Sequence, residues 1–288
     1  MKKIAILIPC YNEEKTITKV INNFKKELPS ATIYVYDNNS TDNSYKLASN
    51  ENCILKKVTK QGKGNVVRCM FHEIEADCYI LVDADNTYSP KKVKSMCKYI
   101  LKRDADMVIG DRLSSTYYQE NKKILHSFGN KLVCFLIHRL FSNKINDVMS
   151  GYRAFSREFV KNVPILSNNF EVETEMTIFA ITNNYKVISI PVLYKDREKG
   201  SISKIKTIKD GLAIIKTIIS LYIENYPKRY YNSLSIIFFI IAMILYYLKI
   251  FIYKYFILIS ILFFITGIIL NNTLKKYKRL LEIYRNRR

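Results

Sequence analysis

The chain has 288 residues, which is room for one medium-sized domain and an appendage. Its formal net charge of +21, from 46 Lys and Arg against 25 Asp and Glu, suits anionic partners, although compositional drift toward Lys explains the bulk charge equally well. None of the six cysteines forms a C-x-x-C pair or lies near a histidine at zinc-finger spacing, so the sequence excludes a zinc finger and indicates reduced thiols in a cytosolic domain.

Short apolar runs alternate with helical patterns over the first 200 residues. The strand candidates are Ile4–Ile8, Thr32–Tyr36, Cys53–Val58, Tyr79–Val82, Met107–Ile109 and Val187–Val192. The helical patterns between them are Glu13–Leu28, Lys63–Glu75 and Pro90–Leu101. This alternation predicts an α/β fold with a largely parallel, doubly wound sheet. Ligands of such sheets gather beyond the carboxyl ends of the strands.

Three polar turns follow three of these strands. Pro9 to Glu13 follows the first strand, Asp37 to Asp42 follows the second, and Asp83-Ala84-Asp85 follows the strand at Tyr79–Val82. Because carboxyl ends of parallel strands share one edge of a sheet, we expect these turns to form one site. A G-x-G-x-x-G sequence does not follow the first strand, which argues against a dinucleotide-binding enzyme.

Asp83 and Asp85 are the key pair of that site. Two carboxylates spaced two residues apart on an extended turn can converge on one hard cation, such as Mg²⁺ or Mn²⁺, and bridge it to a diphosphate. The D-x-D pattern alone is a weak motif, because Asp is common in turns and helix caps. Its position after a buried strand and beside two other polar turns gives it weight.

A helix with one apolar stripe is predicted near residue 215. The stripe has spacings of three and four, and Pro227 ends the pattern. Its members are Ile205, Ile208, Leu212, Ile215, Ile219, Tyr222 and Tyr226. The pattern fits a helix in the plane of a membrane interface and a helix packed on the catalytic domain equally well.

Two uncharged runs follow, Tyr231 to Leu248 and Tyr255 to Leu270, separated by a bend that carries Lys249 and Lys254. Eighteen residues span about 27 Å as a helix, close to the hydrocarbon thickness of a bilayer, so we expect a transmembrane hairpin rather than the core hairpin of a soluble protein. The tail after residue 270 is rich in Lys and Arg, and the positive-inside bias predicts both termini and the catalytic domain in the cytosol.

The ordered blocks of residues 4–210 resemble a known family. The blocks Pro9-Cys10-Tyr11-Asn12-Glu13-Glu14, Asp37 to Asp42, Gly62-Lys63-Gly64 and Asp83-Ala84-Asp85 are similar to family-2 glycosyltransferases of the GT-A fold. The later blocks resemble the polyprenyl-phosphate hexosyltransferase branch, which includes dolichol-phosphate mannose synthases and undecaprenyl-phosphate glycosyltransferases. Those later blocks are Gly110 to Leu113, Phe128 to Asn130, Asp147 with Ser150 to Arg153, and Arg197 to Gly200 with Ser203 and Lys204.

The resemblance implies roles for individual residues. The base and ribose of a nucleotide-sugar would lie against Pro9, Tyr11, Glu13 and Asp37, with Lys63 nearby. Asp83 and Asp85 would hold the metal and the donor diphosphate. Arg112 and Arg153 would face the acceptor phosphate, with Ser127 and Asn130 on the helix between them, and Arg197 and Lys204 would close over the donor phosphates.

Two blocks depart from the family pattern. Asn38 and Asn39 stand where many members carry Asp and Gly, and Asn86-Thr87-Tyr88 follows Asp85 where mannose synthases often carry a metal-ligating Gln. The base contacts, mannose specificity and the full metal shell therefore stay open. Glu173 and Glu175 match an acidic block without an assigned role, and their spacing allows at most one of them to point into the site.

The predicted organisation is a GT-A catalytic domain at 1–200, interface helices at 201–230, a hairpin at 231–270 and a basic tail at 271–288. The predicted reaction is an inverting, metal-dependent transfer of a hexose from a UDP- or GDP-linked donor to a polyprenyl phosphate at the membrane, with no nucleic-acid partner. A processive polysaccharide synthase and a non-catalytic membrane tether are the alternatives. The synthase is disfavoured because the chain has no Trp for a Q-x-x-R-W block. The sugar, the nucleotide, the polyprenyl chain and whether the protein is a homo-oligomer stay open.

Overall fold

The computed structural model describes residues 2–114, 124–142, 145–198 and 207–286. The chain divides into two compact units, Met1–Ile218 and Ile219–Arg288. The division falls within α9 (Thr207–Asn225), the helix predicted for the membrane interface.

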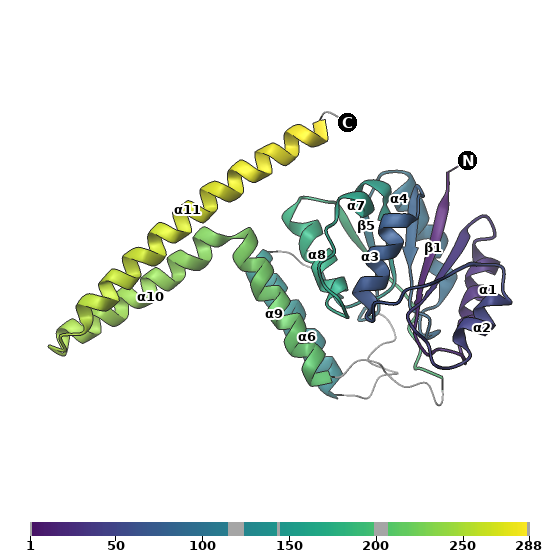
Figure 1. Cartoon of the computed structure of the whole chain (residues 1–288), viewed down its shortest axis with the longest axis horizontal. Helices are drawn as coiled ribbons and strands as arrows, with labels where there is room; N and C mark the ends of the chain where they lie inside the picture. Colours follow the sequence, from purple (N-terminus) through teal and green to yellow (C-terminus); the bar gives the residue numbers. More distant parts are fainter. Residues whose placement is uncertain (1, 115–123, 143–144, 199–206, 287–288) are drawn as a thin grey trace. The chain divides into compact units, whose positions relative to one another are not determined.

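The first unit is built on one seven-stranded sheet with the strand order β3-β2-β1-β4-β6-β5-β7 and with helices on both faces (Figure 1). The strands are β1 (Ile4–Cys10), β2 (Thr32–Asp37), β3 (Ile54–Lys57), β4 (Cys78–Leu81), β5 (Met107–Asp111), β6 (Arg153–Ser156) and β7 (Val187–Pro191). The six predicted strands are present, and the GT-A-like α/β architecture is confirmed. The sheet is mixed rather than wholly parallel.

Alternation along the strands builds two apolar cores. Ile6 and Ile8 of β1 point to one face, where the apolar stripe of α1 (Ile17–Glu27) and that of α4 (Val93–Leu101) cover them. On the other face, Phe71 of α3 (Lys63–Glu73) packs against Tyr79 of β4 and Phe155 of β6. Both faces are buried, as the nearly unbroken apolar sequence of β1 requires.

The strand β6 is absent from the sequence prediction. It pairs antiparallel with β4 on one side and with β5 on the other. It is only four residues long and begins with an arginine, so its apolar pattern is too weak to predict a strand. Its extended conformation depends on the neighbouring strands instead. It is the reason that the sheet is mixed.

The topology brings five chain segments to one edge of the sheet. The strands β1, β2, β4 and β5 all run in the same direction, so the turns after Cys10, Asp37, Leu81 and Asp111 meet there. Because β6 runs the opposite way, its amino end at Arg153 lies at this same edge. The predicted polar turns therefore share one end of the sheet, as expected.

Two further helices, α6 (Ile124–Phe141) and α8 (Val172–Thr182), contact each other in the first unit. α6 lies between β5 and β6 in the chain, and α8 follows α7 (Arg157–Asn162). The segment before α8 is tied down from both sides. Glu175 accepts the backbone N–H groups of Leu166 and Ser167 at 2.8 and 2.9 Å, and Arg68 of α3 donates to the carbonyl of Ile165 at 2.6 Å.

Part of the predicted apolar stripe of α9 is exposed, and Ile215, Tyr222 and Tyr226 are half-buried. Ile208 and Leu212 are 80% and 63% exposed and Ile219 is also exposed, whereas Ile214 and Ile218, off the predicted stripe, are buried. One side of α9 thus packs on the protein, while part of the predicted stripe stays exposed, so both interpretations that the sequence leaves open remain.

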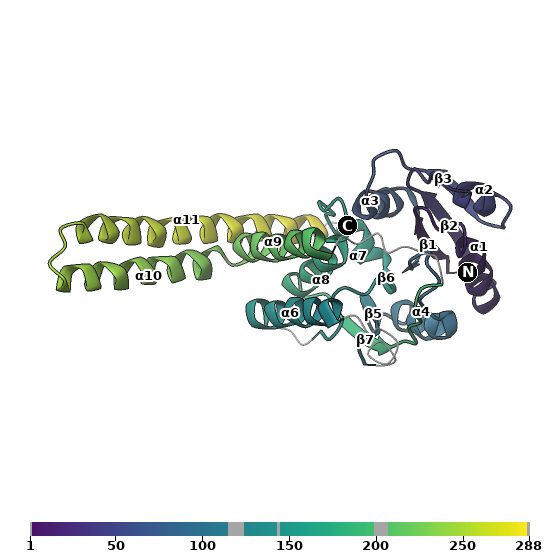
Figure 2. The same ribbon diagram turned by 90° about the horizontal axis from the view of Figure 1, so that it is seen from below.

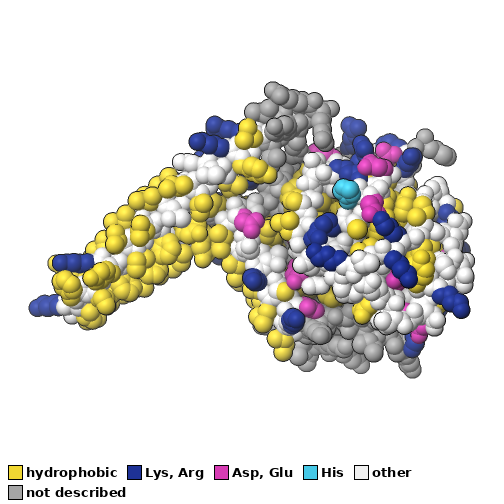
Figure 3. All heavy atoms as spheres, in the orientation of Figure 1, with side chains coloured by type: hydrophobic (Ala, Val, Ile, Leu, Met, Phe, Trp, Pro, Cys, Tyr) yellow, Lys and Arg dark blue, Asp and Glu magenta, His cyan; other side chains and the backbone are white. Residues whose placement is uncertain are grey.

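The second unit is a helical hairpin of α10 (Pro227–Tyr247) and α11 (Tyr253–Asn286), which lie side by side in both views (Figure 2). Spans of Pro227–Tyr247 and Tyr253–Leu280 are long and apolar enough to cross a membrane by length and composition, and only 6% and 11% of an apolar 18-residue stretch within each is buried. Hydrophobic side chains cover the visible surface of the hairpin (Figure 3). Residue 270, where the hairpin was predicted to end, is not an element boundary, because α11 continues unbroken.

Small residues let the two helices of the hairpin approach closely. Ser260 of α11 donates to the carbonyl of Ser235 at 2.9 Å, and Gly267 lies against Tyr231 and Asn232 of α10. Such contacts are typical of helix pairs in membranes, where apolar burial gives no driving force between helices.

Candidate active site

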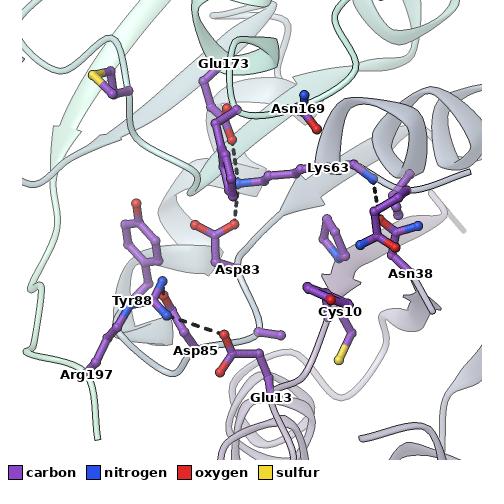
Figure 4. A pocket seen from close by; sticks show the side chains of 18 of the residues that line it. Cys10, Glu13, Asn38, Lys63, Asp83, Asp85, Tyr88, Asn169, Glu173 and Arg197 are labelled. Atoms are coloured by element: carbon purple, nitrogen blue, oxygen red, sulfur yellow. Dashed lines mark hydrogen bonds and ion pairs between the residues drawn. The ribbon is translucent and has the colours of Figure 1, made fainter. Parts of the chain in front are cut away.

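The turns at the shared edge surround a cavity of about 290 Å³ (Figure 4). Eight residues predicted from the sequence line it, namely Pro9, Tyr11, Glu13, Lys63, Asp83, Asp85, Arg112 and Arg197. They come from segments that are up to 188 residues apart in the chain, and the fold alone brings them together.

Asparagines in left-handed conformation shape three of the turns. Asn12 after β1, Asn39 after β2 and Asn86 after β4 have φ of 52°, 60° and 58°. This region is unfavourable for most side chains, and Asn tolerates it better than most. The neighbouring Asn38 lines the cavity and joins two turns, because its Oδ1 accepts the backbone N–H of Gly62 at 2.7 Å.

The carboxylate of Asp83 is held by a buried ammonium group. Lys63, at the start of α3 and only 12% exposed, pairs with Asp83 and also with Glu173 of α8, the latter at 2.5 Å. Burial by itself would raise the pKa of Asp83, but the charge of Lys63 outweighs it, and the pKa lies below its usual value. Asp83 is therefore ionised at neutral pH.

Asp85 is bound by an arginine from the other side of the cavity. Its Oδ1 accepts a hydrogen bond from the hydroxyl of Thr87 at 2.6 Å, and its Oδ2 pairs with Nη2 of Arg197 at 2.6 Å. Burial and the nearby Asp83 carboxylate raise the pKa of Asp85, and Arg197 opposes them. The same guanidinium donates from Nη1 to Glu13 at 3.4 Å.

The residues of this pair fit a divalent cation. Mg²⁺ and similar hard cations are held by one or two carboxylates together with substrate phosphates and water. Among the residues that the structure describes, no group of three or more His, Cys, Asp or Glu side chains is placed to hold a metal. The amide nitrogen of Asn86, the residue after the pair, donates to Glu198 at 3.1 Å. The rest of a coordination shell would thus come from a donor and from water.

Arg112, directly after β5, is fixed by a bidentate ion pair. Its Nε and Nη2 donate to the two oxygens of Asp147 at 2.8 and 2.9 Å, and its guanidinium lies 5.4 Å from the ring centroid of Tyr194. Burial opposes the charge, and Asp147 outweighs it, so the pKa of Arg112 is raised further. Arg112 is a permanent cation at the cavity wall.

A glycine makes room for the Asp83 carboxylate. Gly151, two residues before β6, donates its N–H to the Tyr88 hydroxyl at 2.9 Å, and a β-carbon at this position would collide with the carboxylate of Asp83. Gly62 and Gly64 also lie where a side chain does not fit, since a β-carbon on either would collide with the backbone of residues 167–168.

Three predicted site residues do not line the cavity. Asp37 and Asn130 are buried outside its wall, and Arg153 is 0% exposed. The guanidinium of Arg153 donates to the carbonyls of Val148 and Ser150 and to the hydroxyl of Thr177, at 2.8 Å for the last two. The expectation that Arg153 faces an acceptor phosphate is therefore corrected: its cation is used inside the fold, where burial lowers its pKa to about 10.

Two more predicted residues, the Ser127 side chain and Lys204, lie outside the described residues. Of the acidic block, Glu173 lines the cavity and Glu175 does not, which confirms that at most one of them points into the site. The sequence prediction assigned no role to several other wall residues, among them Asn38, Tyr88, Met149, Asn169, Phe170 and Tyr194. Tyr88 had the clearest signal, because it stands three residues after Asp85.

Comparisons with known proteins agree with this geometry. Residues 5–163, just over half of the chain, match the Glycosyl transferase family 2 model. The chain is 30% identical over 233 residues to Glycosyltransferase AglJ of Haloferax volcanii, covering 81% of this chain and 76% of that protein. It is 26% identical over 214 residues to the UDP-N-acetylglucosamine–dolichyl-phosphate N-acetylglucosaminyltransferase of Methanococcus voltae, covering 66% and 85%.

The fold is shared with a solved structure. Glucosyl-3-phosphoglycerate synthase from Mycobacterium tuberculosis, in complex with Mn²⁺, UDP and phosphoglyceric acid, matches with a TM-score of 0.61 over 78% of each chain. The sequences are only 18% identical, so this likeness concerns the fold. On the family match and the AglJ relationship together, the chain belongs to the family-2 glycosyltransferases.

Proposed function

We propose that this glycosyltransferase moves a hexose from a nucleoside-diphosphate sugar to a polyprenyl phosphate at the cytosolic face of a membrane, with a divalent cation at Asp83 and Asp85. The observation that carries the proposal is the convergence of these two carboxylates with Arg112 and Arg197 in one cavity of a chain that also has a long apolar hairpin. A relative that is named for a dolichyl-phosphate acceptor supports the lipid substrate.

The nucleoside would lie against the turns after β1 and β2. Pro9 and Tyr11 line that side of the cavity. The Oδ1 atom of Asp37 is buried there without a hydrogen-bond partner within the described part of the chain. A buried carboxylate oxygen without a donor is costly, and a ribose hydroxyl or a base N–H is a donor that would satisfy it. Because the side chain lies behind the cavity wall, a contact with the nucleoside requires the wall to shift, and the role of Asp37 stays a prediction.

The bound metal would neutralise charge that develops on the leaving diphosphate. Arg197 and Lys63 are the protein cations on either side of that position, and they can donate hydrogen bonds to phosphate oxygens. A polyprenyl phosphate is already anionic, since the second pKa of a phosphate monoester is about 6, and needs little help from a general base. Arg112, rigidly oriented by Asp147, would attract this anion and aim it. One in-line displacement inverts the anomeric centre.

The acceptor requires that the cavity operate beside a membrane. The exposed stripe of α9 and the apolar surface of the hairpin support that location. The Lys- and Arg-rich second half of α11 supports the cytosolic orientation.

The test is a transfer assay with the full chain in detergent micelles or vesicles. Undecaprenyl and dolichyl phosphate are offered with labelled UDP-glucose, UDP-N-acetylglucosamine and GDP-mannose, and the product is a labelled, mild-acid-labile lipid. Asp85→Asn keeps the size of the side chain but removes its charge, and we expect it to lower the rate by about 100-fold or more. Arg157→Gln, at an exposed ion pair with Glu75, is the control that keeps full activity.

Two results would contradict the proposal. Transfer that survives Asp85→Asn would remove the metal from the reaction. A growing polymer instead of a single lipid-linked hexose would favour a processive synthase.

A further inference from the structure

Both carboxylates of the metal-binding pair already have a cation of the protein beside them. Lys63 lies between Asp83 and Glu173, and Arg197 lies between Asp85 and Glu13 (Figure 4). Each cation is thus shared between one carboxylate of the pair and one further carboxylate of the cavity wall. The arrangement is the same on both sides of the cavity although the residues come from unrelated segments.

Both cations are held in place from outside the cavity. Glu198, next to Arg197, pairs with Lys19 of α1 at 2.7 Å and accepts from Asn86 at 3.1 Å. The backbone N–H of Lys195 donates to the carbonyl of Thr87 at 2.8 Å. Lys63 opens α3, whose first turn is fixed against the segment before α8. These anchors keep the two cations near the pair when it has no ligand.

A divalent cation that arrives alone meets an unfavourable site. It has to compete with Lys63 and Arg197 for the same two carboxylates, inside a partly buried cavity where charges repel more strongly than in water. The described residues offer it no third carboxylate, His or Cys ligand. A nucleoside diphosphate removes both obstacles. Its oxygens supply the missing metal ligands, and they accept hydrogen bonds from the two protein cations, which then compete less for the carboxylates.

We propose that Lys63 and Arg197 are internal counter-ions that make divalent-cation binding depend on the donor diphosphate, and that Glu173 and Glu13 are positioning residues for them. This rests on the metal site of the proposed function and adds a binding order to it. When the diphosphate enters, the two cations turn from Asp83 and Asp85 to the phosphate oxygens. Glu173 and Glu13 keep them within reach, so the carboxylates become free for the metal. The acidic block that had no assigned role thereby acquires one.

The experiment measures Mn²⁺ binding to the full chain in detergent by the EPR signal of free Mn²⁺, without nucleotide and with saturating UDP or GDP. Mixtures of nucleotide and Mn²⁺ without protein provide the correction. For the wild-type chain we expect weak binding of Mn²⁺ alone and at least about tenfold tighter binding with the matching nucleotide. For Arg197→Gln we expect roughly tenfold tighter binding of Mn²⁺ alone, equivalent to about 1.4 kcal/mol, and a smaller gain from nucleotide.

Matched variants separate this effect from a general change of charge. Arg157→Gln removes the same charge from a surface ion pair, at a side chain that is 63% exposed, and should leave both affinities unchanged. In Glu173→Gln, Asp83 is the one carboxylate that remains paired with Lys63 among the described residues, and it holds Lys63 more strongly. Without nucleotide, Mn²⁺ should therefore bind this variant more weakly than the wild type. Glu173→Asp should restore the wild-type value, which a merely structural role of Glu173 would not predict.

The inference is overturned if wild-type affinity for Mn²⁺ is the same with and without nucleotide, or if Arg197→Gln binds Mn²⁺ alone no better than the wild type does. Should Arg197→Gln be unstable, Lys63→Gln tests the same point on the other carboxylate. Absence of Mn²⁺ binding under every condition overturns the metal site and this inference together. If nucleotide still tightens Mn²⁺ binding but the lipid transfer assay fails, only the proposed polyprenyl-phosphate acceptor is contradicted.

Discussion

Gly151 lies where the structure leaves no room for a side chain beside the carboxylate of Asp83. Its backbone N–H is used by Tyr88, and its missing β-carbon makes space for Asp83. Tyr88 is itself buried and packs its ring against Tyr152 and Tyr194. The position of Asp83 is thus set by the backbone just before β6 as much as by its own turn.

We expect Gly151→Ala to lower the transfer rate by roughly 10- to 100-fold, because Asp83 must move to accommodate the methyl group and small misplacements of reacting groups are costly. The rate is measured with saturating donor and acceptor. Gly211→Ala in α9 is the control, since a β-carbon there meets nothing within 4 Å. Unchanged kinetics for Gly151→Ala would show that the carboxylate tolerates displacement.

Arg153 shows how one residue type serves two purposes in this protein. Its guanidinium donates to two carbonyls of the turn that precedes it and to Thr177 of α8, so it closes the turn that ends at Gly151. Arg112, in contrast, has its guanidinium at the cavity wall. The sequence around the two arginines does not distinguish them, because each lies two residues after a glycine in a block of the family pattern.

We expect Arg153→Lys to destabilise the first unit by about 2–4 kcal/mol, since a lysine cannot reach three acceptors and leaves buried carbonyls without donors. Thermal unfolding followed by near-UV circular dichroism measures this. Arg157→Lys, on the surface, should change the stability by less than about 0.5 kcal/mol. Equal stability of the two variants would contradict the structural role of Arg153.

At the scale of elements, α8 is held by its surroundings rather than by its own pattern. All of its first six residues are buried, including Glu173 and Glu175. Glu175 accepts a backbone hydrogen bond from Leu166 in the segment before the helix, and Arg68 of α3 donates to the carbonyl of Ile165 in the same segment. These contacts turn Glu173 to the cavity, which explains why the acidic block could not be interpreted from its spacing.

In the proposed function, the exposed part of the α9 stripe is the surface that contacts the membrane interface. We expect Leu212→Glu to lower kcat/KM for a polyprenyl phosphate in vesicles by roughly tenfold, because an apolar contact with the interface is replaced by a charge. Donor hydrolysis in detergent should be unaffected. Lys216→Gln, an exposed position of the same helix with the same change in charge, is the control. Equal effects of both variants would mean that charge rather than the stripe matters.

At the scale of the whole molecule, the chain combines a soluble-type catalytic unit with a hairpin whose surface is apolar. α11 alone has 34 residues and is about 51 Å long, more than the roughly 30 Å hydrocarbon core. Its uncharged first part suits the bilayer, and its second part carries Lys275, Lys276, Lys278 and Arg279. The proposed tail is therefore a helical extension of the second span.

The proposed topology can be tested with thiol labelling, because all six native cysteines lie at residue 134 or before it. A membrane-impermeant maleimide applied to intact cells should label Phe251→Cys, between α10 and α11. It should not label the native cysteines or Thr273→Cys until the membrane is opened. Labelling of Thr273→Cys in intact cells would place the end of the hairpin outside and contradict the orientation.

Much of the site could be predicted because its turns follow strongly apolar strands. β1 and β4 are recognisable from composition alone, so the sequence predicts that the positions after them, including Asp83 and Asp85, lie at one sheet edge. Asp37 and Asn38 show the limit of such reasoning. Both follow β2, and which of them reaches the cavity wall depends on a bond from Asn38 to Gly62 that local sequence does not specify.

The sequence by itself determined the α/β alternation, the acidic pair at the end of β4, the family blocks and the apolar hairpin. Each of these is encoded in residues that are near one another in the chain. Only the tertiary structure decided the antiparallel β6, the burial of Arg153, the exposed stripe of α9 and the pairing of Lys63 and Arg197 with four carboxylates. These features are contacts between distant segments, and their energies depend on neighbours that no local pattern records.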